Sequence, residues 1–115
     1  MRYTRSEPRI TVRHEGDISI FDITGYFTED SAEGINAAYD QSANAAKILL
    51  RFDRQSFITS SGFGLIVKLV WKTRNRGQIL RVAHPSNQMR QVFDIIGLSQ
   101  TIDIFASEEK ALTDF

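Results

Sequence analysis

Cysteine is absent from this 115-residue sequence, and its absence excludes disulfide bonds, catalytic thiols and cysteine-bound metal ions. Histidine is scarce as well, because His14 and His84 are the only two and they show none of the close ligand spacing of a metal site. The sequence therefore predicts no metal site and no cofactor.

Net charge is also absent, because 14 lysines and arginines balance 14 aspartates and glutamates. A chain without a net field is not expected to have nucleic acid or an anionic membrane as its main partner. No segment reaches the run of about 18 apolar residues that a membrane-spanning helix requires, and no apolar stretch of the signal-peptide kind follows residues 1–8. We expect a soluble cytoplasmic domain, and the composition leaves its oligomeric state open.

The pattern of apolar residues predicts alternating strands and helices. Two β-branched runs, 10–14 and 18–24, flank Glu15-Gly16-Asp17 and predict a hairpin. Further strands are expected at 47–53, 78–83 and 101–105, with helices between and after them. This order, β-β-α-β-α-β-α-β-α, predicts an α/β fold in which helices pack against a mixed sheet of four or five strands. Because no linker or repeat is found, we expect one domain over 1–115, with its core at about 10–112.

The clearest helical periodicity in the sequence covers residues 60–76. Phe63, Ile66, Val67, Val70 and Trp71 recur at the spacing of one helix face. They are predicted to form the apolar stripe that packs this helix against the sheet.

The candidate site lies at the start of this helix, in Thr59-Ser60-Ser61-Gly62-Phe63-Gly64. Ser60 stands where an N-cap is expected, beside free backbone N–H groups and the positive end of the helix dipole. A phosphate on Ser60 would add a charge of about −1.5 to −2, which such a helix end can hold. Gly62 and Gly64 would leave the first turn bare, so that a kinase or partner can approach closely. On the residues alone, an ordinary cap is the commoner role of such a serine.

Enzyme motifs are not found around this site. The pair Gly62 and Gly64 lacks the third glycine of a dinucleotide fingerprint, because Val67 occupies its position. The strained Gly-x-Ser-x-Gly elbow of hydrolases is missing too, because Ile58 stands in place of its first glycine. We therefore predict no catalytic residues and a protein that is not an enzyme.

Three stretches of the chain resemble the STAS domain family, and in particular its bacterial anti-sigma-factor antagonists. Residues 48–72 carry Ser-Ser-Gly-Phe-Gly at the start of an amphipathic helix that follows a buried strand. Residues 90–98 match a helix that ends in Gly-Leu, and residues 102–112 match a strand followed by a Ser-Glu-Glu-x-Ala-Leu helix. The likeness extends over about 10–112. It implies the STAS fold, which agrees with the order of strands and helices predicted above.

The resemblance implies a protein-binding module that phosphorylation controls. In such antagonists the unphosphorylated domain binds an anti-sigma factor that is also a serine kinase. The kinase phosphorylates the first serine of the motif, the complex dissociates, and a serine phosphatase resets the domain. That serine corresponds to Ser60, the predicted phosphoacceptor. The predicted partner-binding loop comprises Thr59, Ser61, Gly62, Gly64, Phe27 and Thr28.

Two positions depart from the family pattern. Thr59 stands where an aspartate usually precedes the phosphorylated serine, and Arg51 stands where an aspartate commonly ends the preceding strand. Because a hydroxyl cannot replace a carboxylate as a charge-assisted acceptor, phosphorylation of Ser60, its shift to Thr59 or Ser61, and its loss all stay open. The alternative function is a constitutive STAS scaffold or accessory subunit of a transporter or signalling complex.

Overall fold

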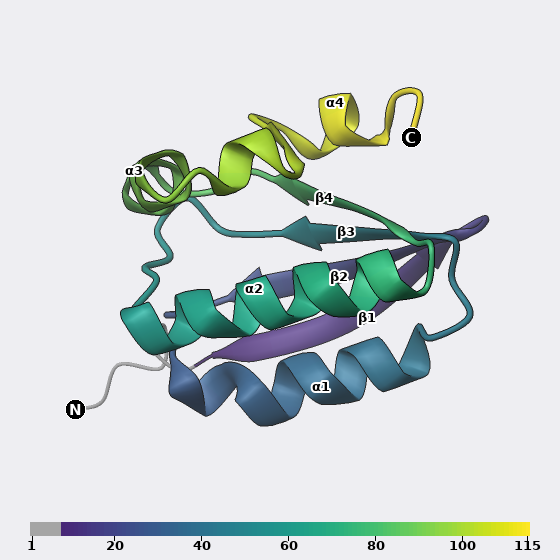
Figure 1. Ribbon diagram of the computed structural model, residues 1–115, viewed down its shortest axis with the longest axis horizontal. Coiled ribbons are helices and arrows are strands. Elements are labelled where there is room, and N and C mark those ends of the chain that lie inside the picture. Colours follow the sequence, from purple (N-terminus) through teal and green to yellow (C-terminus); the bar gives the residue numbers. More distant parts are fainter. Residues whose placement is uncertain (1–7) are drawn as a thin grey trace.

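The computed structural model describes residues 8–115, in which helices pack on a five-stranded sheet (Figure 1). The strands are β1 Arg9–Glu15, β2 Ile18–Thr24, β3 Lys47–Arg51, β4 Ile79–Ala83 and β5 Asp103–Phe105. The helices are α1 Ala32–Gln41, α2 Ser60–Asn75, α3 Asn87–Ile95 and α4 Glu108–Leu112, with 3-10 turns η2 Glu29–Ser31 and η3 Leu98–Gln100. This order confirms the predicted fold class. The N-terminal stretch, where no signal peptide is expected, lies outside the described residues up to position 7.

The strands lie in the order β1-β2-β3-β4-β5. β1 and β2 pair antiparallel as the predicted hairpin, and Gly16 supplies the positive φ of +62° in its turn. All other neighbours pair in parallel, with helices as connections. The segments that follow β2, β3, β4 and β5 therefore emerge at one edge of the sheet, which we call the carboxyl edge.

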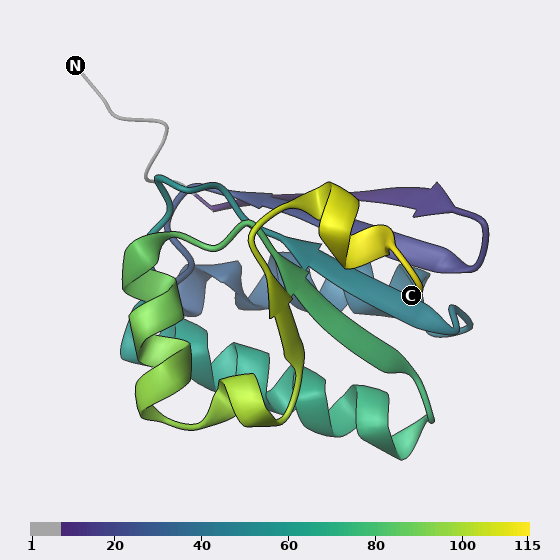
Figure 2. The same ribbon diagram turned by 90° about the horizontal axis from the view of Figure 1, so that it is seen from above.

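Both faces of the sheet are covered, and β3 shows how. Ile48 and Leu50 face the larger core under α1, α2 and α3, whereas Leu49 faces a smaller cluster closed by Ala111 of α4. All three β3 side chains are fully buried. Figure 2 shows α2 and α4 on opposite faces of the sheet. No helix of the described chain is long and apolar enough to cross a membrane.

An ion-pair network fastens α4 to its face of the sheet. Asp22 of β2 binds the guanidinium of Arg13 through two hydrogen bonds and that of Arg51 at 3.3 Å. Glu108 of α4 bridges the same two arginines, at 2.9 Å from each. The side-chain hydrogen bond to Asp22 and, as a smaller contribution, the one to Glu108 raise the pKa of Arg13. The Arg51 side chain therefore binds Asp22 and Glu108 on the α4 face of the sheet and does not contribute to the start of α2.

The buried stripe of α2 differs from the predicted one. Ile66 and Val70 are buried as expected, but Leu69 and Thr73 complete the buried face, while Trp71 is 62% exposed. The side of α2 that carries Leu69 faces α1, and Leu69 lines the space between the two helices. Apolar residues stand on both sides of the Ile66–Val70 line, so the periodicity alone could not choose the side that faces the sheet.

The difference between Leu69 and Trp71 can be measured. Leu69→Ala removes a side chain that is 3% exposed and should lower the free energy of unfolding by about 2–5 kcal/mol. Trp71→Ala should change it by no more than about 0.5 kcal/mol, because that ring lies mostly in solvent. Urea unfolding followed by circular dichroism checks both variants. Equal losses would contradict the observed orientation of α2.

Candidate functional site

The predicted site residues come from two loops that the backbone joins at the carboxyl edge. Phe27 and Ile58 form an isolated parallel bridge, in which the Phe27 amide donates to the Phe57 carbonyl at 2.7 Å. The Thr59 amide donates to the Phe27 carbonyl at 3.1 Å. The loop after β2 and the start of α2 are thereby held side by side.

Thr59, and not Ser60, is the N-cap of α2. Its backbone is extended, with φ of −95° and ψ of 170°, and its Oγ1 accepts a hydrogen bond from the Gly62 amide at 3.1 Å. The bridge to Phe27 explains the shift, because it keeps Thr59 in a strand-like conformation and the helix can begin only afterwards. The predicted cap role of Ser60 is therefore wrong. Thr and Ser both cap helices well, so the sequence could not decide between neighbours.

Ser60 is the first residue of α2, and it is exposed. Within residues 8–115 its hydroxyl makes no hydrogen bond, in contrast to the Thr59 hydroxyl, which is engaged as the cap. The first turn of α2 contains no acidic residue, so the positive end of the helix dipole is not neutralised there. Ser61 is exposed in the same turn. The arrangement places two exposed hydroxyls at a helix end that favours added negative charge.

Gly62 faces inward. A Cβ at this position would lie 2.1 Å from the Phe27 carbonyl oxygen, which is much shorter than a van der Waals contact. The expectation that Gly62 leaves surface free for a partner is therefore wrong, because its missing side chain allows α2 to approach the Phe27 backbone. Gly64 differs: a Cβ there would meet nothing within 4 Å, which agrees with a bare surface at that point.

Phe27 and Thr28 hold the loop from inside. The Phe27 side chain is completely buried and packs edge-on against Phe52, with ring centroids 5.8 Å apart. The prediction that Phe27 belongs to the partner-binding surface is wrong for its side chain. Thr28 is half-buried and forms a capping box with η2. Its amide donates to the Ser31 Oγ at 3.1 Å, and its Oγ1 accepts from the Asp30 amide at 3.1 Å.

A groove of about 270 Å³ lies beside Ser60, between the start of α2 and α3. Its apolar wall consists of Phe63, Val92 and Ile96. Gln88 closes the end of the groove, because its side chain donates to and accepts from the backbone of Ile58 at 3.0 and 2.9 Å. Sequence reasoning missed this contribution of α3.

The adjacent isoleucines Ile95 and Ile96 are the sequence feature that could have indicated the role of α3. The sequence pattern places Ile96 on the same helix face as Met89 and Phe93, yet it is 46% exposed while those two are buried. Its neighbour Ile95 is 82% exposed. Two adjacent isoleucines at the surface indicate that this end of α3 has apolar area to offer a partner.

No group of three histidine, aspartate or glutamate side chains gathers as metal ligands in the described part of the chain. In the described residues neither histidine forms a hydrogen bond with Ser60. The Nδ1 of His14 lies 3.2 Å from the Ser19 hydroxyl, and the Nδ1 of His84 lies 3.1 Å from the Phe52 carbonyl. The site therefore consists of hydroxyls, a helix N-terminus and an apolar groove.

The family model described as STAS domain matches residues 9–111. An anti-sigma factor antagonist from Mycobacterium paratuberculosis superposes with a TM-score of 0.80 at 15% identity, over 94% of this chain and 93% of that chain. No curated protein sequence matches the chain.

Two further solved structures share the fold. The anti-sigma factor antagonist SpoIIAA in its unphosphorylated form superposes with a TM-score of 0.73 at 26% identity, over 90% of this chain and 93% of that chain. A sulfate transporter family protein from Wolinella succinogenes gives a TM-score of 0.75 at 20% identity, over 87% of this chain and 85% of that chain.

The two glycines of the helix start make a matched pair for mutation. Gly62→Ala should lower the free energy of unfolding by about 2–3 kcal/mol, because the new methyl group collides with the Phe27 carbonyl. Gly64→Ala should leave stability unchanged or raise it by up to about 1 kcal/mol, since it adds helix propensity in open space. Thermal and urea unfolding of both variants check this. If Gly62→Ala were as stable as Gly64→Ala, the close approach would not exist.

Proposed function

Because this chain belongs to the STAS domain family, we propose that it is a phosphorylation-controlled protein-binding module of the anti-sigma-factor antagonist kind. In this proposal its unphosphorylated form binds an anti-sigma factor that is also a serine kinase. Ser60 accepts the phosphate, and a serine phosphatase removes it. The module binds partners and catalyses no reaction of its own.

One observation carries the proposal: Ser60 has an exposed hydroxyl that borders an apolar groove and makes no hydrogen bond with any residue from 8 to 115. A partner that covers this groove would exclude water from Phe63, Val92 and Ile96 and from the neutral hydroxyl beside them. Phosphorylation would bring a charge of about −1.5 to −2 into the same interface, where a dianion without a paired cation is costly. In the free domain the same phosphate lies at the N-terminus of α2, which stabilises it. The modification would therefore oppose the complex and leave the fold intact.

The cap explains why Ser60 is preferred over Thr59 as the acceptor. Thr59 is half-buried and its Oγ1 is held against the Gly62 amide at 3.1 Å, so its hydroxyl is less accessible to a kinase than the exposed hydroxyl of Ser60. Ser60 carries no such duty within the described residues. The likeness to SpoIIAA, at 26% identity, supports the same general arrangement.

A constitutive STAS subunit is the second candidate function. The observation that favours it is the hydroxyl of Thr59, which stands where the family usually has a carboxylate. The fold likeness to a sulfate transporter family protein is compatible with it. Such a subunit would use the same groove for a permanent contact and would not respond to a kinase.

Phosphorylation distinguishes the two candidate functions directly. Incubation of the chain with ATP and the serine kinase that binds it should add one phosphate, seen by intact mass and located by peptide mapping. Ser60→Ala should abolish the mass gain, and Ser61→Ala, its exposed neighbour, should retain it. A gain that survives Ser60→Ala would eliminate Ser60 as the acceptor. A kinase that binds the chain without modifying it would favour the constitutive subunit.

A charge at position 60 should uncouple binding from stability. Ser60→Asp should weaken the kinase complex at least tenfold, about 1.4 kcal/mol, because the carboxylate enters the apolar interface. The free energy of unfolding should stay equal or rise by about 0.3–1 kcal/mol, since an acid in the first turn of a helix is favourable. Ser60→Ala is the neutral control and should keep its affinity. Unchanged affinity together with a large loss of stability would show that Ser60 has a structural role instead.

A further inference from the structure

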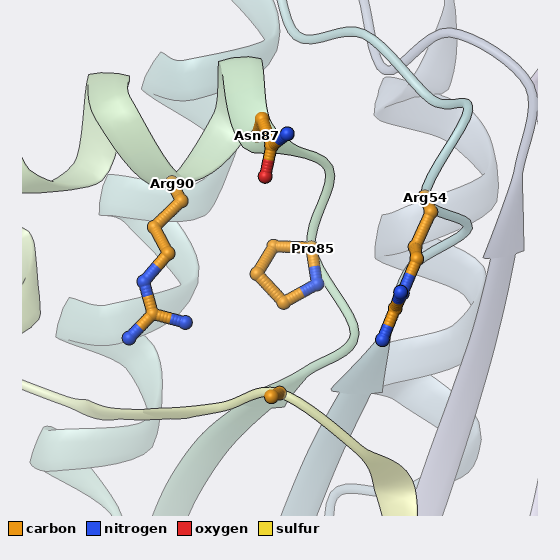
Figure 3. Close-up of a pocket in the computed structure, with 5 residues that line it drawn as sticks. Arg54, Pro85, Asn87 and Arg90 are labelled. Carbon is orange, nitrogen blue, oxygen red and sulfur yellow. The ribbon is translucent and has the colours of Figure 1, made fainter.

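A second pocket, of about 260 Å³, lies at the carboxyl edge of the sheet (Figure 3). Arg54 reaches it from the segment after β3, Pro85 from the segment after β4, Asn87 from the first position of α3, and Ala106 from the position after β5. Arg90 reaches it from α3. Three parallel strands thus end around one cavity, and in open α/β sheets such carboxyl ends are where ligands bind.

The lining carries two positive charges and no negative one. Arg54 and Arg90 are exposed, and neither takes part in an ion pair or a side-chain hydrogen bond within residues 8–115. Arg13, Arg51 and Arg81 behave differently, since each is held by two or more oxygen acceptors. Figure 3 shows the side chains of Arg54 and Arg90 extending in the same direction on either side of Pro85. Two arginine forks are therefore free to bind one anion.

The surrounding backbone adds to this field. α3 begins at Asn87 with no acidic residue in its first turn, so its positive end opens beside the pocket. His84 has a positive φ of 61°, and its amide donates to the Phe105 carbonyl at 2.9 Å. Its Nδ1 lies 3.1 Å from the Phe52 carbonyl. These contacts tie the ends of β3, β4 and β5 together, so the wall of the pocket is held before any ligand arrives.

We propose that this pocket binds a phosphate group, as inorganic phosphate or as a small phosphate monoester. Two guanidinium groups match the two negative charges of a phosphate, whereas a carboxylate would leave one arginine uncompensated. The volume is slightly below the range of about 300–1,000 Å³ that suits drug-sized ligands, and it favours a compact anion. The lining shares no residue with the groove beside Ser60, so this binding and the proposed switch can succeed or fail independently.

Titration of the isotope-labelled chain with sodium phosphate tests the proposal without any partner protein. Sodium chloride keeps the ionic strength constant, and the pH is held where phosphate is a dianion. We expect saturable shifts of the Asn87 amide and of the Arg54 and Arg90 side-chain N–H signals. Arg54→Gln and Arg90→Gln should each raise the Kd about tenfold, the size expected for a lost charge-assisted contact. Arg74→Gln, an exposed arginine near the end of α2, is the matched control and should leave the Kd unchanged.

Sodium acetate, titrated in parallel, should bind at least tenfold more weakly than phosphate. The melting temperatures of the glutamine variants should equal that of the unsubstituted chain, because neither arginine side chain makes an ion pair in the described structure. If a glutamine variant unfolds, Arg54→Lys and Arg90→Lys keep the charge but lose the fork, and they should raise the Kd several-fold. Shifts that never saturate, equal binding of acetate, or a Kd unaffected by substitution of both arginines would overturn the proposal.

Discussion

The close approach of α2 to the Phe27 backbone is the contact on which the site depends. The Phe27 carbonyl oxygen accepts a hydrogen bond from the Thr59 amide. It also lies so close to Gly62 that no side chain fits at that position. The pairing with Phe27 keeps Thr59 extended, makes it the cap and starts the helix at Ser60. The exposed position of the Ser60 hydroxyl is thus a consequence of a backbone contact between two loops. Phe27 supports the contact from the core, where its ring is fully buried.

The carboxyl edge of the sheet concentrates the features that could bind other molecules. Parallel pairing brings the ends of β2, β3, β4 and β5 to this edge, and a helix follows each of them. The apolar groove beside Ser60 and the pocket between Arg54 and Arg90 both lie there, and α3 contributes to each. On the other face of the sheet, the ion-pair network around Asp22 and Glu108 fastens α4.

Family membership and fold are shown by the match over residues 9–111 and by the solved structures. The switch at Ser60 is a proposal supported by an exposed hydroxyl, an unneutralised helix end and an adjacent groove. Thr59 stands where the family usually has an aspartate, and either residue could cap α2. The Thr59 hydroxyl is already engaged as the cap, and this favours Ser60 as the acceptor.

The sequence by itself determined the strands, the helices, their order and the motif that marks the site, because these depend on local periodicity and on residue types at short range. It could not determine which of two neighbouring hydroxyls caps α2, which side of the Ile66–Val70 line meets the sheet, or that Phe27 is buried. Each of these depends on contacts between segments far apart in the chain. The placement of Arg54 and Arg90 around one pocket has the same origin, since only the parallel pairing of the strands brings these segments to one cavity.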